Sequence, residues 1–301
     1  MNNPTATSYF FDLANNNAYE RWRDQKLNDY PEEAQSLLVK VSDFYNPSDA
    51  EVTALRERIS KTNMALYACT VSKGEDVGRT KRALSSLGLR LGLKTLDANL
   101  CADEDNYSLL SVSKGVSKSR YIPYTNKPIN WHTDGYYNSP DRKIKGMGLH
   151  CISPAAAGGE NALMDPEIAY ILLRDENPDF IRALMHPHAM EIPPNIEGDS
   201  NIREVQSGPV FSLFGDDATL HMRYTARTRS IKWREDVATR AAVTFLSDLL
   251  NSDSPYIFRH RMAAGEGVLC NNVLHNRTGF KDDKTRQRSF LRARYFDRIT
   301  N

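Results

Sequence analysis

Two potential metal ligands stand close together in the segment NWHTDGYYN, which spans positions 130–138. His132 offers a neutral nitrogen and Asp134 an anionic oxygen, and a single residue separates them. Because the chain contains seven histidines, such a pair can arise by chance and is weak evidence when it stands alone. A third candidate, His275, lies just after a predicted strand in the segment 265–280. Two histidines and one carboxylate on different strands of a β-barrel would form a facial triad, which is typical of non-haem Fe(II) oxygenases because three coordination positions stay open.

Arginines are concentrated near the end of the chain, in TRQRSFLRARYF at 285–296. If 286–295 is a regular strand, its two-residue period places Phe290 on one face with four of them: Arg286, Arg288, Arg292 and Arg294. A barrel interior tolerates guanidinium groups only when anions pair with them, because an unpaired buried charge is costly. The pattern therefore predicts an anionic co-substrate, and the planar fork of arginine suits a carboxylate.

The elements that would position these residues change in character along the chain. Three are predicted before residue 100: helices over 47–63 and 76–93, and a strand over 64–71. The first helix is expected to begin with a capping box formed by Ser48 and Glu51. After residue 105 short β-like runs predominate, at 106–114, 145–153, 160–165, 188–192, 209–215, 218–225, 256–262, 267–270 and 289–296. Helical inserts are predicted at 165–176 and 234–251.

Turn sequences between these runs, GDD at 215–217 and AAGEG at 263–267, are expected to form hairpins. Many short strands without a strand–helix–strand alternation predict an antiparallel sandwich or barrel with helices packed outside it. The predicted fold class is therefore mainly β with helical inserts. No repeat or low-complexity linker divides the sequence, so we expect a single domain over 1–301: a polar arm at 1–35, a helical and strand part at 36–104, and a β core at 105–296.

Four motifs occur in this sequence in an order that is more specific than any one of them alone. They are WHTD at 131–134, the glycine pair of GGEN at 158–161, His275 in LHNR, and Arg288, which lies thirteen residues after that histidine. In this order they resemble the taurine dioxygenase-like (TauD/TfdA) family of Fe(II)- and 2-oxoglutarate-dependent dioxygenases. The resemblance covers residues 105–296 and implies a double-stranded β-helix core, which is a jelly-roll of the cupin type flanked by helices.

The resemblance also implies a cofactor and a reaction. Fe(II) would be bound by His132, Asp134 and His275, with 2-oxoglutarate and O2 as co-substrates. Arg288 would bind the distal carboxylate of 2-oxoglutarate, and Asn161 stands where the family often has a threonine that touches the same carboxylate. The expected outcome is hydroxylation, or oxidative cleavage after hydroxylation, with release of succinate and CO2. A carboxylate at 134 leaves no ligand vacancy for halide and so disfavours halogenation.

The substrate would be a small, acidic metabolite. By the resemblance, Gly135 and Tyr137 line the substrate pocket, and Arg292 matches an arginine that contacts the anionic end of the substrate in sulfonate-hydroxylating relatives. The basic stretch 221–234 is read either as a solvated edge strand or as a rim that guides an anion, with Arg223 the best candidate. The tyrosines at 121, 124, 136 and 137 could instead form a cage for a quaternary ammonium. The arginine excess favours the anion.

The charge balance of the whole chain limits its partners. Thirty-nine basic residues stand against thirty-eight acidic ones, so no long-range field draws the protein to nucleic acid or to a membrane. The four cysteines form no C-x-x-C pair, and the first thirty residues show no secretory signal, so a reduced, cytoplasmic protein is expected. The oligomeric state stays open, a homo-oligomer included. The alternatives to a dioxygenase are a zinc-type hydrolase or isomerase on a cupin-like barrel, and a non-catalytic jelly-roll binding module.

Overall fold

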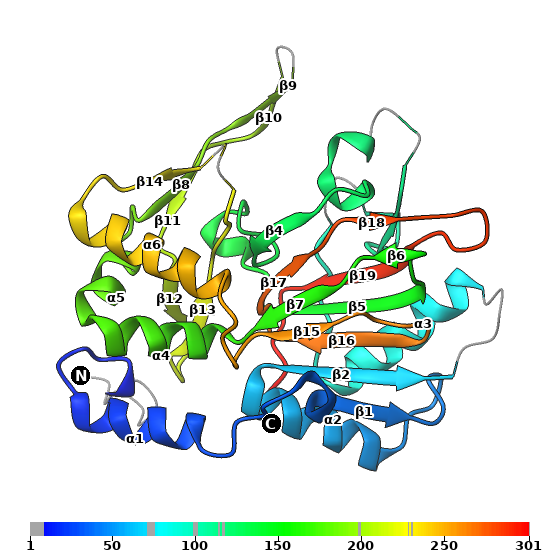
Figure 1. Cartoon of the computed structure of the whole chain (residues 1–301), viewed down its shortest axis with the longest axis horizontal. Coiled ribbons are helices and arrows are strands. Elements are labelled where there is room, and N and C mark those ends of the chain that lie inside the picture. Colours follow the sequence, from blue (N-terminus) through cyan, green and yellow to red (C-terminus); the bar gives the residue numbers. More distant parts are fainter. Residues whose placement is uncertain are drawn as a thin grey trace. The chain divides into compact units, whose positions relative to one another are not determined.

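Figure 1 shows the computed structural model of the protein, which describes residues 9–70, 76–98, 102–113, 115, 118–197, 200–227, 229 and 231–300. The described residues form six α-helices: α1 (Asn16–Leu27), α2 (Asp49–Thr62), α3 (Val77–Arg90), α4 (Pro166–Glu176), α5 (Pro178–Leu184) and α6 (Val237–Leu250). None of these helices has the length and apolar character that crossing a membrane requires. Many short strands accompany the helices, so the fold is mixed, and the predicted abundance of strands is confirmed.

Two sheets carry most of the strands. The larger has six strands in the order β1 (Leu38–Val41), β2 (Met64–Cys69), β16 (Glu266–Cys270), β5 (Gly146–Ser153), β19 (Ser289–Tyr295) and β3 (Ser108–Ser111). The second has four strands in the order β15 (Phe258–His260), β7 (Asn161–Met164), β17 (Leu274–Arg277) and β4 (Ile129–His132). In the larger sheet β1 and β2 are parallel, whereas β16 and β19 pair antiparallel with their neighbours.

The chain forms two compact units, each assembled from separate stretches of sequence. One, here called the sheet unit, comprises Pro31–Asn130, Arg142–Leu163 and Phe258–Asn301. The other, here called the helical unit, comprises Met1–Tyr30, Trp131–Asp141 and Met164–Ile257. The single domain over 1–301, with its internal boundaries at 35 and 105, stays a prediction.

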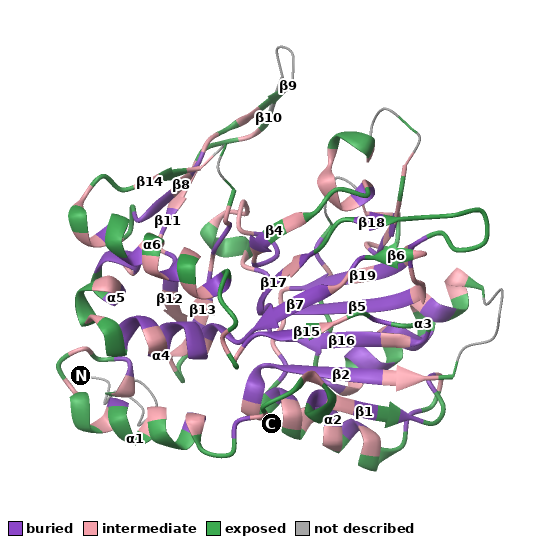
Figure 2. Cartoon of the chain, viewed as in Figure 1, coloured by how far each residue is buried: buried purple, intermediate pink, exposed green. Residues whose placement is uncertain are grey.

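In the sheet unit, α2 and α3 pack against the six-stranded sheet. Their buried side chains join those of the strands in one apolar cluster, which includes Val52, Leu55, Ile59, Ala83, Leu84, Leu87, Tyr67, Leu269, Leu291 and Ala293. Each fully buried leucine or isoleucine contributes roughly 1.5–3 kcal/mol. Figure 2 shows the same distribution, with buried residues along β2, β5, β16 and β19. The cluster fixes α2 and α3 on the strands β2, β16 and β19 of the larger sheet.

The start of α2 confirms the predicted capping box. The Ser48 hydroxyl accepts a hydrogen bond from the Glu51 amide at 3.3 Å, and the Glu51 carboxylate accepts one from the Ser48 amide at 2.6 Å. The two side chains satisfy amides that would otherwise have no partner at the helix terminus.

The helical unit contains α1, which lies in the segment expected only as a polar arm. Lys26 fixes it: the ammonium lies 2.8 Å from Asp165 Oδ2 and 2.6 Å from Glu167 Oε2, and Asp165 caps α4. The unit also holds a three-stranded sheet and two hairpins, formed by β8 (Met190–Ile192), β11 (Gln206–Gly208), β14 (Lys232–Trp233), β9 (Asn195–Glu197), β10 (Ser200–Arg203), β12 (Phe211–Phe214) and β13 (Thr219–Met222).

One of the two predicted hairpins is wrong. The GDD turn joins β12 and β13, which pair antiparallel as expected. The AAGEG turn instead connects β15 to β16, and these strands belong to different sheets. Within the turn the Glu266 carboxylate lies 2.8 Å from His260 Nε2 and accepts a hydrogen bond from the Ala263 amide at 2.8 Å. These bonds stabilise a corner between the sheets rather than a return along the same sheet.

Candidate metal centre

His132 and Asp134 lie at the end of β4 and just beyond it. The segment is held by the strand-like stretch 224–226: the Thr133 amide donates to the Tyr224 carbonyl at 3.0 Å, the Tyr224 amide donates to Thr133 Oγ1 at 3.1 Å, and His132 forms a bridge with Thr225. Gly135 follows with φ of +69°, a conformation that glycine adopts without steric cost. These bonds and this turn orient both side chains from a short loop.

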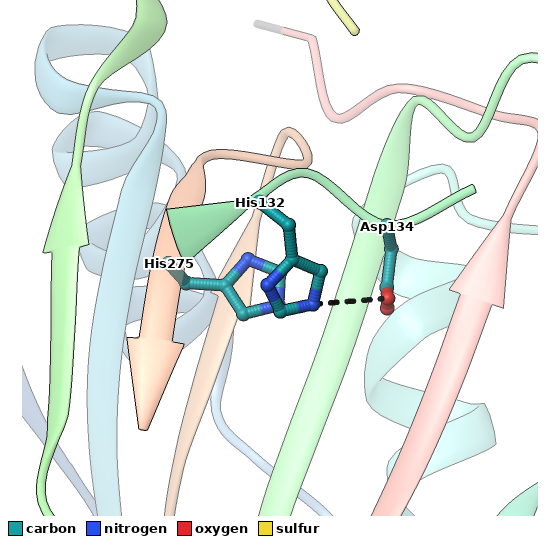
Figure 3. Close-up of side chains that lie close together, drawn as sticks. All are labelled: His132, Asp134 and His275. Carbon is teal, nitrogen blue, oxygen red and sulfur yellow. Dashed lines mark ion pairs between the residues drawn. The ribbon is translucent and has the colours of Figure 1, made fainter. Parts of the chain in front are cut away.

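His275 is the second residue of β17, which neighbours β4 in the four-stranded sheet. One nitrogen or oxygen atom from each of His132, Asp134 and His275 lies within 4.8 Å of the others, and Figure 3 shows the three side chains converging. His132 Nε2 is 3.9 Å from Asp134 Oδ1. The structure thus brings together the three residues predicted as ligands.

The donor set fits a divalent transition metal. His275 Nδ1 lies 2.9 Å from the Val273 carbonyl, which can only accept, so the proton is assigned to Nδ1 and the lone pair of Nε2 would face a bound metal. Asp134 and His275 are 5% and 8% exposed, so a bound ion would be largely shielded from water. Two imidazoles and one carboxylate leave three positions of an octahedral ion for other ligands.

Arg288, which immediately precedes β19, is buried in an apolar setting. It is 3% exposed, and its guanidinium carbon lies 3.9 Å from the ring centre of Phe290 and 5.2 Å from that of Phe280. Burial lowers the pKa of Arg288 to about 10, and Nε has no hydrogen-bond partner among the described residues. A buried cation of this kind needs an anion, which agrees with the predicted carboxylate site.

The glycine pair of GGEN is required for this packing. Gly158 lies in β6 (Ala157–Gly158), which pairs with β18 (Phe280–Lys281), and has φ of +71°. A Cβ atom at Gly158 would lie 2.3 Å from the Gly279 carbonyl oxygen, which leaves no room for a side chain. A Cβ atom at Gly159 would lie 3.7 Å from Arg288 Nε, an ordinary contact, but φ of +74° at this position favours glycine. The pair therefore allows the close approach of Gly158 to the Gly279 carbonyl and a left-handed backbone beside Arg288.

Asn161 begins β7 and is 4% exposed. Its amide donates a hydrogen bond at 3.0 Å to the carbonyl of Asn276, the residue after His275. The structure places Asn161 beside the strand that carries His275, while its role toward 2-oxoglutarate stays a prediction.

The arginines in and just before the last strand differ in their burial and in their ion-pair partners. Arg286 lies before β19 and is exposed, with an ion pair to Asp283 at 3.4 Å. Arg294 is buried and forms an ion pair with Asp97, which also pairs with Arg142 at 3.1 Å. The prediction that a co-substrate would neutralise the whole row is therefore wrong for these two arginines. Arg292 is half-buried within β19, and its role as a substrate ligand stays a prediction.

Arg223, expected as a substrate ligand, donates to the backbone. Its Nε donates to the Tyr136 carbonyl at 2.7 Å, and its other nitrogens donate to the carbonyls of Gln206 and Met190 at 2.8 and 3.1 Å. Burial lowers the pKa of Arg223 to about 10, and the charge of Arg203 adds to the effect. These bonds favour a different role, in which Arg223 positions the loop that follows Asp134.

Aromatic and basic side chains surround that loop within the helical unit. The Tyr136 ring lies 6.3 Å from the His132 ring and 5.1 Å from the Tyr137 ring. Arg227 donates to the Tyr136 hydroxyl at 3.1 Å, and the Arg203 guanidinium lies 5.6 Å from the Tyr137 ring centre. Arg203 Nε is buried without a hydrogen-bond partner among the described residues. The sequence had drawn attention to Tyr137 and, within the basic stretch 221–234, to Arg227, but not to Arg203.

The sequence profile described as "Taurine catabolism dioxygenase TauD, TfdA family" matches residues 73–294. The chain belongs to this family. Its membership confirms the predicted identity as an Fe(II)- and 2-oxoglutarate-dependent dioxygenase at the level of the family, and favours it over a zinc-type hydrolase or a silent binding module.

Similar proteins in the family include two named uridine-5'-phosphate dioxygenase. The Amycolatopsis protein is 29% identical over 171 residues, which is 55% of this chain and 60% of that protein. The Streptomyces protein is 27% identical over 202 residues, 64% of this chain and 71% of that one. Among solved structures, an asparagine oxygenase in complex with Fe(II), 3-hydroxyasparagine and succinate aligns with a TM-score of 0.55 at 12% identity, covering 98% of this chain and 92% of that one. This last likeness concerns the fold alone.

Proposed function

We propose that the protein is an Fe(II)- and 2-oxoglutarate-dependent dioxygenase that hydroxylates a small anionic metabolite, or cleaves it after hydroxylation. The observation that carries this proposal is the convergence of His132, Asp134 and His275 within 4.8 Å in a chain of this family. These residues would hold Fe(II), while Arg288 and Asn161 would hold 2-oxoglutarate. With O2 as the oxidant, the bound metal and 2-oxoglutarate would supply the oxidising chemistry, in which one oxygen atom enters the substrate and the other enters succinate, with release of CO2.

The proposed fold behind this site is a double-stranded β-helix. On either side of the segment 165–257, successive strands of the two larger sheets alternate between the four-stranded and the six-stranded sheet: β4, β5 and β7 before it, and β15, β16, β17 and β19 after it. Such alternation is what a jelly-roll requires, because its chain passes from sheet to sheet at each corner.

The chain's own residues would bind and orient the reactants. The protonated Nδ1 of His275 keeps the ring oriented through the Val273 carbonyl, and Arg223 holds the backbone after Asp134 through the Tyr136 carbonyl. Gly135 and Tyr137 would line the substrate side, and Arg292 remains a candidate for the anionic end of the substrate.

For the substrate we propose a phosphate monoester, with nucleoside 5'-monophosphates as the first class to test. Arg203 and Arg227 would bind the phosphate, since arginine forks suit phosphate oxygens. Tyr136 and Tyr137 offer faces against which a planar base can stack. Two relatives carry the name uridine-5'-phosphate dioxygenase, which supports the same choice.

Succinate formation tests the proposal most directly. We would incubate the protein with Fe(II), 2-oxoglutarate and a panel that pairs each nucleoside 5'-monophosphate with its nucleoside, and include taurine and asparagine. Only phosphorylated members should raise succinate above the substrate-free level. Arg203→Gln and Arg227→Gln should raise the KM for the phosphorylated substrate, whereas Arg240→Gln, on the exposed surface of α6, should not. Equal turnover of nucleoside and nucleotide would exclude the phosphate site. The dioxygenase would be excluded if anaerobic addition of Fe(II) and 2-oxoglutarate gave no visible charge-transfer absorption band and turnover gave no succinate.

A further inference from the structure

Two buried guanidinium groups in the sheet unit lie against the same phenyl ring. Arg277 ends β17 and Arg288 precedes β19, and each is only 3% exposed. The guanidinium carbons lie 4.8 Å and 5.2 Å from the ring centre of Phe280. Two like charges in an apolar setting repel each other and lose their hydration, so their proximity is costly unless an anion lies between or beside them.

The hydrogen bonds of Arg277 leave most of its donors available. Nη2 donates to the carbonyls of Thr125, at 2.9 Å, and Lys127. Nη1 and Nε are buried and have no hydrogen-bond partner among the described residues, and the same is true of Arg288 Nε. Buried polar groups nearly always have partners, so an arginine with two buried nitrogens in this state points to a ligand.

The protein itself supplies little negative charge here. The Asp282 carboxylate accepts a hydrogen bond from the Arg288 backbone amide at 2.9 Å, and its charge acts on Arg288. For Arg277, the neighbouring charge that acts on the guanidinium is that of Arg288. Among the described residues, therefore, the carboxylate whose charge acts on these groups is that of the exposed Asp282, and it acts on Arg288 and not on Arg277.

The position of Arg277 on its strand relates it to the metal centre. His275 and Arg277 are both buried and alternate with the half-buried Asn276, so the two side chains share one face of β17. Two residues of strand span roughly 7 Å. A co-substrate that meets the metal beside His275 and extends along β17 would bring its far end level with Arg277.

We propose that Arg277 is a second arginine for the distal carboxylate of 2-oxoglutarate, acting together with Arg288. This inference rests on the proposed dioxygenase function. Arg277 provides Nη1 and Nε, while its Nη2 remains bonded to the 125–127 loop, so that loop and the co-substrate site are joined through one side chain. Phe280 keeps both guanidinium groups at this site through its ring face.

The test compares binding of two 2-oxo acids by calorimetry under anaerobic conditions with Fe(II) present. One is 2-oxoglutarate and the other is 2-oxopentanoate, which has a methyl group in place of the distal carboxylate. Arg277→Gln should weaken 2-oxoglutarate binding by about 10- to 100-fold but 2-oxopentanoate binding by less than about 3-fold, since a hydrogen bond between charged groups is lost only with the former. Arg277→Lys keeps the positive charge but loses the planar guanidinium. Its preference for 2-oxoglutarate over 2-oxopentanoate should therefore lie between those of the wild type and Arg277→Gln.

The control is Arg142→Gln, which removes a guanidinium whose partner is Asp97; the preference between the two acids should not change. If Arg277→Gln or Arg277→Lys weakens both acids equally, Arg277 has only a structural role in the loop and the inference is overturned. A wild-type protein that binds 2-oxopentanoate as well as 2-oxoglutarate would overturn the distal site itself. Wild-type protein that binds neither acid would instead refute the dioxygenase function on which the inference rests.

Discussion

Replacing Arg223 by methionine separates two roles that the sequence could not distinguish. A substrate ligand would be dispensable for folding, whereas a positioning residue would be needed for it. Arg223 makes three short hydrogen bonds, of 2.7, 2.8 and 3.1 Å, to the carbonyls of Tyr136, Gln206 and Met190. The net contribution of an intramolecular hydrogen bond, with the loss of hydration included, is ~1 kcal/mol, so the three bonds together contribute about 2–3 kcal/mol.

Arg223→Met should therefore lower the free energy of unfolding by about 2–3 kcal/mol, measured in urea with probes for both units. It should also raise the KM for substrate, because the Tyr136 carbonyl that it holds belongs to the loop after Asp134. Arg240→Met is the matched control and should change stability by less than about 0.5 kcal/mol, since this side chain is exposed. A variant as stable as the wild type that loses only substrate binding would refute the positioning role and restore the substrate ligand.

Three further predictions concern the metal, the glycine pair and pH. Asp134→Ala should lose Fe(II), seen in metal content after anaerobic gel filtration, whereas Arg288→Ala should keep Fe(II) but bind 2-oxoglutarate more weakly. Gly158→Ala should unfold at least 2 °C below the wild type and bind 2-oxoglutarate more weakly, because the added Cβ would meet the Gly279 carbonyl at 2.3 Å; unchanged values would contradict the close approach. Burial lowers the pKa of His150 to about 4, so the unfolded chain takes up this proton first and stability should fall by up to about 3 kcal/mol between pH 6.5 and 4. In His150→Phe, the free energy of unfolding measured against pH should no longer show this fall between pH 6.5 and 4. If the variant and the wild type show the same pH dependence, the assignment to His150 is refuted.

Local patterns were sufficient for much of the fold. The capping box at Ser48 depends on two residues three positions apart. The periods of helices and strands depend on burial of one face. Both features can therefore be recognised in a short stretch of sequence. The predicted helices over 165–176 and 234–251 correspond to α4 and α6, which start after Asp165 and Asp236 as N-caps. Helix α1 was not predicted, because its sequence is polar and its anchoring depends on Lys26 meeting carboxylates far along the chain.

Hairpin pairing was predicted less well, for a physical reason. The turns GDD and AAGEG both contain glycine and acidic residues, yet only the first returns the chain along its own sheet. A turn sequence restricts backbone angles but does not state which sheet the next strand will enter. That choice depends on the apolar faces available elsewhere in the molecule.

The sequence by itself determined the family and the candidate ligands: a histidine and an aspartate two apart, a distal histidine, and an arginine thirteen residues beyond it. Only the tertiary structure decided how each arginine is used. Arg294 is neutralised by Asp97, a partner 197 residues away, and Arg223 is bonded to carbonyls. Arg277 and Arg288 keep buried donors that have no hydrogen-bond partner within the described part of the chain. The reason is that charge type is a property of one residue, whereas desolvation and pairing are properties of everything folded around it.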